Sequence, residues 1–380
     1  KCSADAARLM HRRRNANECF GACNKDDNPW QLSGGDIKWY TDWLAVRGVN
    51  LFIPHAFYYS ICGKRKDERP PDVGPHSIWW VHYEAWSTYW RRLSWLMTDI
   101  DLHAEVAVLC RNRDLCPDTV RPLFERQIGF QYIPESYFPA CTVEDGALCL
   151  HGHRYTAVLG DKALFPDAAH PEVSALEPDC RCDPPQPMLR CASFNKEGRA
   201  CWLLVNEGNT PIKTRLTLPV DAPLCRCDLW NGQPCACPAE HTAKGACLPL
   251  ELPARGSLLL FTCTTQETKI LPLPPTYLSL PVPDFILVEE DAARAAKTYR
   301  AVLQVAAADI EAATPLLTLR GQEMAELTVN GQPAGVSFWQ PHKFPLAGLL
   351  TPGENTLTLT LTGSPANRYG KHPVPYGLER

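Results

Sequence analysis

The pattern of apolar and polar positions in the first hundred residues predicts alternating strands and helices. Two short apolar runs, residues 15–20 and 49–53, are typical of buried strands, and residues 36–46 between them place apolar side chains at helical spacing. Strand, helix and strand in this order predict a parallel βαβ unit. Aromatic residues at helical spacing over residues 79–98 predict a second helix. We therefore expect residues 1–100 to be the carboxyl-terminal end of a (β/α)8 barrel, comprising its last two βα units.

The following segment, residues 101–163, alternates again between strand and helix patterns. Residues 103–110 and 130–138 are predicted as strands, residues 118–127 as a helix, and residues 152–160 as a third strand. This order predicts a small α/β layer of flavodoxin-like or glutamine-amidotransferase-like type. The segment contains no glycine-rich phosphate loop, so the sequence indicates no nucleotide site.

Residues 190–265 have the pattern of strands alone and predict a β-sandwich. Within them, Asn231-Gly232 is a strong signal for a two-residue hairpin turn. Prolines gather in residues 164–189 before this segment and in residues 266–284 after it. We expect these two proline-rich stretches to be linkers.

Residues 285–380 predict a second all-β domain. Asn330-Gly331 again indicates a hairpin, and residues 351–363 combine a turn with strict alternation of apolar and polar residues. The four patterns together predict a multidomain protein that combines α/β and all-β parts. A length of 380 residues is enough for such a domain organisation.

Charge and hydropathy narrow the possible partners. Charged residues make up 21% of the chain with both signs nearly balanced, and the net charge is −4, so no basic surface is indicated that would gather nucleic acid or an anionic membrane. The chain contains no run of 18 apolar residues, so no membrane-spanning segment is predicted. The amino end carries neither a secretory signal nor an initiating Met, and we expect a cytoplasmic protein whose chain begins inside a domain.

The 18 cysteines admit two interpretations. In a short secreted chain they would form a disulfide framework, but here they are spread over a long chain, which favours reduced and mostly buried thiols. A zinc site built from Cys225, Cys227, Cys235 and Cys237 is a further alternative. In a two-residue hairpin the pair Cys225 and Cys227 and the pair Cys235 and Cys237 lie on opposite faces of the sheet, so we expect no metal site there.

Glu18 is the main candidate for chemistry because it lies at the carboxyl end of the first predicted strand. In (β/α)8 barrels this end of the strands carries the catalytic residues. His55 lies directly after the second strand of the predicted unit. The alternatives are that Glu18 is a structural carboxylate paired with an arginine, and that His55 is bonded to backbone in the turn after its strand.

The first hundred residues resemble the end of the catalytic barrel in bacterial glycoside hydrolases of the α-L-rhamnosidase-like kind. The resemblance rests on ECFGA at residues 18–22, on residues 36–61, and on RPPDVGP at residues 69–75. It is the more specific of two resemblances, because it joins a strand-end Glu and a strand-end His at barrel spacing. It implies that the chain is the carboxyl-terminal part of such an enzyme and lacks the amino-terminal half of the barrel.

The last quarter of the chain resembles the sugar-binding jelly roll of family 2 glycoside hydrolases. ELTVNGQPAG at residues 326–335 supplies a hairpin that carries VNG, and residues 344–361 supply a GxN turn followed by an alternating strand. This implies a galactose-binding-like jelly roll at residues 285–380. The α/β and β-sandwich segments resemble the accessory domains that follow the barrel in the same enzymes.

The resemblances imply hydrolysis of terminal glycosidic bonds in plant or host glycans, with α-L-rhamnosides favoured and β-galactosides or β-glucuronides as alternatives. Glu18 would be the nucleophile or base, the general acid would lie in the missing half, and His55, Tyr58 and Trp79 would bind the carbohydrate. For the aromatic residues the alternative is packing in the core. No cofactor is expected, and a calcium ion, present in some relatives, is not assignable to any residue. The competing class of function is a non-catalytic carbohydrate-binding or structural module.

Overall fold

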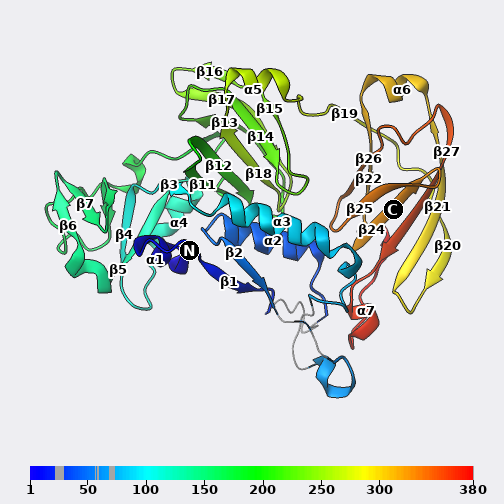
Figure 1. Ribbon diagram of the computed structural model, residues 1–380, viewed down its shortest axis with the longest axis horizontal. Helices are drawn as coiled ribbons and strands as arrows, with labels where there is room; N and C mark the ends of the chain where they lie inside the picture. Colours follow the sequence, from blue (N-terminus) through cyan, green and yellow to red (C-terminus); the bar gives the residue numbers. More distant parts are fainter. Residues whose placement is uncertain (22–29, 56, 58–59, 68–72, 380) are drawn as a thin grey trace. The chain divides into compact units, whose positions relative to one another are not determined.

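The computed structural model of the protein describes residues 1–21, 30–55, 57, 60–67 and 73–379 (Figure 1). The chain divides into two compact units. Unit 1 comprises Lys1–Asn17, Thr41–Phe52 and Thr88–Pro274, and unit 2 comprises Glu18–Tyr40, Ile53–Ser87 and Pro275–Arg380. This division is coarser than the six segments expected from the sequence, so the boundaries of those segments remain predictions.

The predicted strand, helix and strand near the amino end are present. They are β1 (Ala16–Cys19), α2 (Gly34–Ala45) and β2 (Leu51–Pro54), and the second predicted helix is α3 (Tyr83–Leu96). The amide of Leu51 donates to the carbonyl of Asn15 (3.2 Å), and the amide of His55 donates to the carbonyl of Cys19 (2.8 Å). In both bonds the donor residue follows the acceptor residue by the same number of positions along the chain. The two strands therefore run in the same direction, and β1 and β2 form a parallel two-stranded sheet. Its assignment to a barrel remains a prediction.

A single buried side chain, that of Asn50, ties these segments together. Its Oδ1 accepts a hydrogen bond from the amide of Asn15 (2.7 Å), and its Nδ2 donates to the carbonyls of Arg13 (2.9 Å) and Met97 (3.3 Å). Met97 follows α3 directly, while Asn15 and Asn50 precede the two strands. The amide therefore fixes the start of both strands to the end of α3.

The small α/β layer of unit 1 is built on a three-stranded parallel sheet of order β5-β4-β9. Its elements are β4 (Val106–Cys110), α4 (Pro117–Glu125), β5 (Phe130–Pro134) and β9 (Ala157–Leu159), and α1 (Cys2–Leu9) contacts β5. α4 begins with Pro117 in its first turn and buries Val120 and Leu123 in a core shared with the three strands. The predicted alternation of strand and helix is thus present.

Residues 152–160, which we predict as one strand, form two. β8 (His153–Tyr155) pairs with β7 (Ala147–Leu150) in an antiparallel sheet that also contains β6 (Thr142–Glu144), whereas β9 pairs with β4. The chain bends between them at Thr156, whose hydroxyl donates to Glu105 (3.2 Å). The prediction of a single strand is wrong because apolar residues continue across a point where the chain passes from one sheet to another.

Two antiparallel sheets form the β-sandwich of unit 1, with strand orders β10-β13-β17-β16 and β15-β14-β18-β12-β11-β3. The first contains β10 (Arg181–Asp183), β13 (Ile212–Leu218), β16 (Glu240–Thr242) and β17 (Gly245–Leu252), and the second contains β3 (Asp101–Leu102), β11 (Leu189–Lys196), β12 (Arg199–Asn206), β14 (Leu224–Asp228), β15 (Gln233–Cys237) and β18 (Ser257–Thr262). Leu216 and Leu250 of one sheet share a core with Trp202 and Leu260 of the other. The sandwich also includes β3 and β10, which lie outside the predicted range 190–265.

The turn at Asn231-Gly232 is longer than the predicted two-residue hairpin. Asp228 pairs with Gln233, so residues 229–232 connect β14 to β15. The side chain of Asp228 accepts from the amide of Trp230 (2.9 Å), and that of Asn231 accepts from the amide of Gln233 (2.8 Å). These local bonds stabilise the longer loop, which is why the Asn-Gly pair alone misplaces the register.

Every cysteine that the structure describes is a free thiol. Despite the shifted register, Cys227 faces Pro234 and Cys235 faces Arg226, so the two cysteine pairs of the hairpin lie on opposite faces of the sheet. Among the described residues, no group of three or more His, Cys, Asp or Glu side chains is placed to hold a metal ion.

The carboxyl-terminal part of unit 2 contains sheets of order β20-β21-β27-β24-β25, β19-β22-β26 and β23-β28. Their strands are β19 (Tyr277–Ser279), β20 (Ile286–Asp291), β21 (Ala296–Val305), β22 (Thr314–Leu319), β23 (Gly321–Gln322), β24 (Met324–Val329), β25 (Gln332–Ser337), β26 (His342–Pro345), β27 (Gly353–Thr362) and β28 (Gly377–Leu378). Asn330 and Gly331 have φ of 51° and 79° between paired strands, which confirms the two-residue turn. The alternation in β27 buries Leu357, Leu359 and Leu361. The jelly-roll assignment of this region remains a prediction.

The remaining elements are short helices: η1 (Gly63–Asp67), η2 (Trp80–His82), η3 (Glu135–Ala140), η4 (Val173–Ala175), α5 (Thr265–Ile270), α6 (Ala307–Ala312) and α7 (Ala366–Tyr369). α5 begins at a capping box, in which Thr264 and Glu267 each accept a bond from the backbone of the other. Among the helices described, none is long and apolar enough to cross a membrane.

Candidate functional site

The parallel pairing of β1 and β2 brings the carboxyl ends of both strands to one edge of their sheet. Glu18 is the penultimate residue of β1, and His55 follows the last residue of β2. The bond from the amide of His55 to the carbonyl of Cys19 continues the ladder to this edge. Both residues predicted from the sequence therefore lie at the end of the sheet where βα folds place their chemistry.

Glu18 lies on the open face of this small sheet. Side chains alternate between the two faces of a strand, and Cys19 and Phe52 are buried at 5% and 8% exposure. Glu18 is exposed, and across the pair it is level with Ile53, which is 47% exposed. The carboxylate of Glu18 forms no ion pair with an arginine in the described part of the chain. A structural ion pair thus gains no support, and Glu18 is accessible for a ligand.

His55 is held against the chain that leaves β1. A Cβ atom added to Gly21 would come within 2.8 Å of Cδ2 of the imidazole, so the ring packs directly on the Gly21 backbone. The Nδ1 atom of His55 is buried and has no hydrogen-bond partner among the described residues. A buried polar atom without a partner is costly, and a ligand hydroxyl at this position would satisfy it.

The two aromatic residues predicted to bind a sugar have different positions. Tyr58 lies outside the described residues. Trp79 is 5% exposed, and its ring lies edge-on to Trp86 with the centroids 6.5 Å apart. This placement agrees with the alternative of core packing for Trp79, and its contact with a sugar remains a prediction.

A second aromatic group, missed in part by the sequence analysis, lies close to the end of β1. The ring of Phe57 packs edge-on against Trp80 (5.5 Å between centroids) and Tyr83 (6.3 Å), and Trp80 and Tyr83 are 5.0 Å apart. Phe57 is 48% exposed. Burial raises the pKa of Tyr83, and the nearby thiol of Cys19 at the end of β1 raises it further. Phe57, Trp80 and Tyr83, the aromatic cluster, therefore offer an apolar surface beside the strand ends.

Comparison with solved structures identifies a protein of similar architecture. The structure of a rhamnosidase from Novosphingobium sp. PP1Y matches with a TM-score of 0.65 at 14% sequence identity, and the match covers 96% of this chain and 45% of the rhamnosidase. The chain has a glycoside-hydrolase-like fold. It spans less than half the length of that rhamnosidase.

Other comparisons add less. A β-galactosidase from Bacillus circulans sp. alkalophilus matches at 12% identity over 68% of this chain and 57% of its own, but its TM-score of 0.39 is too low to support an inference. A β-galactosidase from G. stearothermophilus has a TM-score of 0.36 at 10% identity, over 68% of this chain and 60% of its own. No protein-family model and no curated protein sequence matches the chain.

Within this glycoside-hydrolase-like fold, the strand ends combine an accessible carboxylate, an imidazole with an unused buried nitrogen, and an exposed aromatic surface. A carboxylate can act as a nucleophile or base, and sugar rings pack their C–H groups on aromatic faces. Sequence position alone could not separate Phe57 from Tyr58 or Trp80 from Trp79, because neighbouring residues differ only in the side of the chain on which they lie. The signal that could have found Tyr83 is its position at the first turn of α3.

Proposed function

We propose that this chain is the carboxyl-terminal part of an enzyme that hydrolyses terminal glycosidic bonds in plant or host glycans, with α-L-rhamnosides as the favoured substrates. The observation that carries the proposal is the accessible carboxylate of Glu18 at the carboxyl end of a parallel strand, in a chain whose fold is glycoside-hydrolase-like. The rhamnoside preference is supported by the sequence resemblance and by the name of the rhamnosidase of similar fold. β-Galactosides and β-glucuronides are the next candidates.

The open face of the β1–β2 sheet supports the proposal that these strands belong to a larger barrel. Leu51 and Ile53 are 37% and 47% exposed on that face, although apolar strand residues are normally covered. In a (β/α)8 barrel this face is directed inward and is covered by the other strands. We propose that the amino-terminal half of the barrel covers it and leaves the strand ends, with Glu18, at the mouth of the barrel.

Glycoside hydrolysis through an oxocarbenium-like transition state needs two carboxyl groups on either side of the bond. Glu18 would supply one of them, as the nucleophile of a retaining enzyme or the base of an inverting one. The general acid would come from the amino-terminal half of the barrel. The two roles differ in the separation of the carboxyl groups, which is about 5 Å for retention and roughly 6.5–9.5 Å for inversion.

The neighbouring side chains would hold the sugar. The unused Nδ1 of His55 would hydrogen-bond a ring hydroxyl, and the aromatic cluster of Phe57, Trp80 and Tyr83 would pack against the apolar face of the ring. Tyr58 and Trp79 remain predicted contacts from the sequence. No cofactor is proposed, and a cytoplasmic location remains a prediction.

The test is Glu18→Gln in the full-length protein, assayed with 4-nitrophenyl α-L-rhamnoside, β-D-galactoside and β-D-glucuronide. Loss of a catalytic carboxylate should lower kcat on the order of 10³-fold or more while the thermal midpoint stays close to that of the parent. Glu354→Gln is the matched control, because Glu354 is an exposed carboxylate on β27 of unit 2. Unchanged turnover in Glu18→Gln would exclude the catalytic role, and the substrate that is cleaved identifies the sugar.

The second candidate function is a non-catalytic carbohydrate-binding module. One observation favours it. Glu18 is the only carboxylate among the residues of β1 and β2, whereas glycoside hydrolysis needs two carboxyl groups. In that case none of the three glycosides would be hydrolysed by the full-length protein, and binding of the free sugars would persist in Glu18→Gln.

A further inference from the structure

Cys225 on β14 and Cys263 directly after β18 are neighbours in the β-sandwich of unit 1, where the two strands pair side by side (Figure 1). In this antiparallel pair Cys225 lies opposite Phe261, and the amide of Cys263 donates to the carbonyl of Pro223 (2.9 Å), which continues the ladder past the last paired residues. Cys263 is therefore two positions beyond the residue opposite Cys225. Side chains two positions apart on a strand point to the same face, so the two thiols lie diagonally on one face of the sheet.

The two sulfur atoms are close enough to bond. Both cysteines are free thiols, and their Sγ atoms are 2.7 Å apart. A disulfide bond is about 2.0 Å long, so closing it requires the sulfur atoms to approach by less than about 1 Å. The adjacent hairpin differs in this respect, because its Cys227 and Cys235 lie on opposite faces of the sheet.

The backbone around Cys263 is held on both sides. The ladder bond to Pro223 fixes it on one side, and on the other the next residue, Thr264, is the N-cap of α5 in its capping box with Glu267. Arg199 on β12 bonds to Glu267 (2.7 Å) and to the carbonyl of Thr262 (3.2 Å), which ties the start of α5 to the sheet. The thiol of Cys263 is therefore already positioned for reaction with its neighbour, which lowers the entropic cost of joining them.

Exposure differs between the two thiols and sets the order in which they react. Cys225 is fully buried, whereas Cys263 is 9% exposed. Burial raises the pKa of Cys225, and the hydrogen bond to the Cys263 thiol and the charge of that group raise it further. A thiol that stays protonated is a poor nucleophile, so an oxidant in solution reacts with Cys263 first.

We propose that Cys225 and Cys263 are an oxidation site, at which a low-molecular-weight disulfide such as oxidised glutathione joins β14 to the end of β18 through a disulfide bond. The Cys263 thiolate attacks one sulfur of the oxidant and releases one glutathione thiolate. Cys225 then attacks Sγ of Cys263, and the second glutathione leaves. Two electrons pass from the two thiols to the oxidant, and the two protons end on the two released glutathione molecules.

The bond closes a loop whose ends are 38 positions apart and which contains β15, β16 and β17. Cross-linking such a loop restricts the unfolded chain and so stabilises the folded one. We expect the thermal midpoint of the oxidised protein to be higher by about 5 °C or more. The pair belongs to unit 1 and Glu18 to unit 2, and the inference does not depend on the proposed hydrolysis.

Peptide mapping tests the inference. The folded protein is incubated with oxidised glutathione or with dithiothreitol, its remaining thiols are alkylated in denaturant, and its tryptic peptides are identified by mass spectrometry. Trypsin releases peptides 216–226 and 256–269, which contain Cys225 and Cys263 as their only cysteines. We expect these two peptides to be joined after oxidised glutathione and separate after dithiothreitol. If they stay separate after oxidation, or if either is joined to peptide 227–244 of the adjacent hairpin, the proposal is overturned.

Variants connect the bond to stability. In Cys263→Ser, oxidised glutathione should give no joined peptide and no rise in the thermal midpoint. Cys235→Ser is the matched control, because it removes a thiol from the opposite face of the same sheet, and it should keep both the joined peptide and the rise. A rise in Cys263→Ser as large as that in the parent would assign the stabilisation to another cysteine pair and refute the proposed effect of this bond.

Discussion

Asp179 should make unit 1 less stable as the pH rises from about 4 toward neutrality. Its Oδ2 atom is buried and has no hydrogen-bond partner among the described residues, and a Cβ atom added to Gly129 would lie 2.8 Å from it. Burial, and to a smaller extent the charge of Glu105, raises the pKa of Asp179 from 3.8 to about 7, a net value in which the hydrogen bond from the Gly129 amide offsets part of the rise. The carboxyl group is therefore protonated in the folded protein under conditions where it is ionised in the unfolded chain.

The sign and size of the effect follow from linkage. The folded state holds the proton of the Asp179 carboxyl group more tightly than the unfolded chain does. The contribution of this protonated group to the free energy of unfolding is therefore complete below pH 3.8 and is lost as the pH rises to about 7. At 1.36 kcal/mol per pH unit, the interval from 3.8 to about 7 corresponds to about 4 kcal/mol in the free energy of unfolding. Ionisation is already under way in the unfolded chain at pH 5, so the part lost between pH 5 and pH 8 is about 2.5 kcal/mol.

Asp179→Asn keeps the shape of the side chain and removes the titration. Urea unfolding followed by tryptophan fluorescence at pH 5, 6.5 and 8 measures the difference, and Trp202 is a suitable reporter because its Nε1 donates to the carbonyl of Asp179 (3.2 Å). The stability of the variant relative to the parent should increase by about 2.5 kcal/mol from pH 5 to pH 8. Asp167→Asn, at an exposed aspartate, should show no such trend. A pH dependence of Asp179→Asn identical to that of the parent would refute the reasoning.

Two further predictions concern a buried ion pair and the aromatic cluster. Glu207 joins Arg47 and Arg190, all with side chains 9–12% exposed, so Glu207→Gln should lower the free energy of unfolding by about 3–5 kcal/mol in urea titrations. Glu251, the exposed partner of Lys213, provides the control, since Glu251→Gln should change the free energy of unfolding by less than about 1 kcal/mol. A loss of stability in Glu251→Gln as large as that in Glu207→Gln would contradict the burial argument. Phe57→Ala should raise KM roughly tenfold with little change in kcat, and an unaltered KM would exclude a sugar contact.

Local patterns in the sequence were sufficient for much of the fold. The βαβ unit of β1, α2 and β2 was predictable because its apolar runs and helical spacing are set by short-range periodicity. The turn at Asn330-Gly331 was predictable because both residues readily adopt positive φ. The pattern of residues 152–160 predicts one strand where the structure has two, because periodicity does not reveal when a chain changes sheets.

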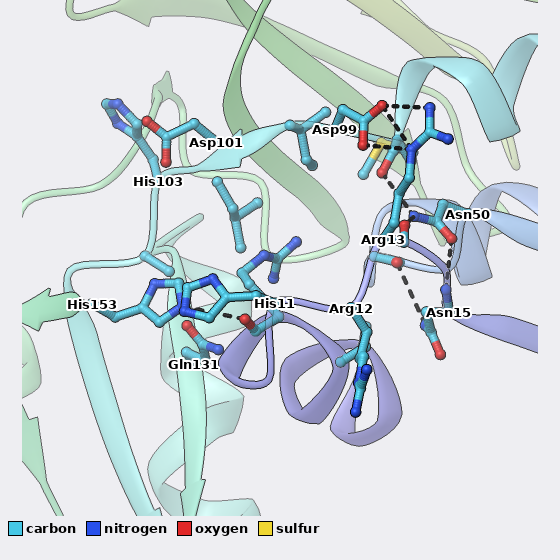
Figure 2. A pocket seen from close by; sticks show the side chains of 18 of the residues that line it. His11, Arg12, Arg13, Asn15, Asn50, Asp99, Asp101, His103, Gln131 and His153 are labelled. Atoms are coloured by element: carbon cyan, nitrogen blue, oxygen red, sulfur yellow. Dashed lines mark hydrogen bonds and ion pairs between the residues drawn. The ribbon is translucent and has the colours of Figure 1, made fainter. Parts of the chain in front are cut away.

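The candidate site was predictable to the level of strand ends. Glu18 and His55 follow from their positions in the βαβ unit, since strand direction determines where the ends lie. The aromatic residues around these strand ends were not predictable, because the turn that precedes α3 determines whether Trp79 or Trp80 packs against Phe57. The stacking of the His11 and His153 rings, whose centroids are 5.4 Å apart (Figure 2), could not be foreseen either, since 142 positions separate these residues in the chain and only tertiary packing brings them together.

The carboxamide at Asn50 has a chemical identity that no other side chain of its size reproduces. Both its hydrogen-donating and its accepting atom are occupied by the peptide groups of Arg13, Asn15 and Met97, which come from two separate stretches of backbone. Aspartate has the same outline but would turn lone pairs toward two carbonyl oxygens, and leucine would leave three peptide groups unsatisfied. Natural variation at this position should accordingly be far narrower than at the apolar positions around it, where one hydrocarbon can replace another.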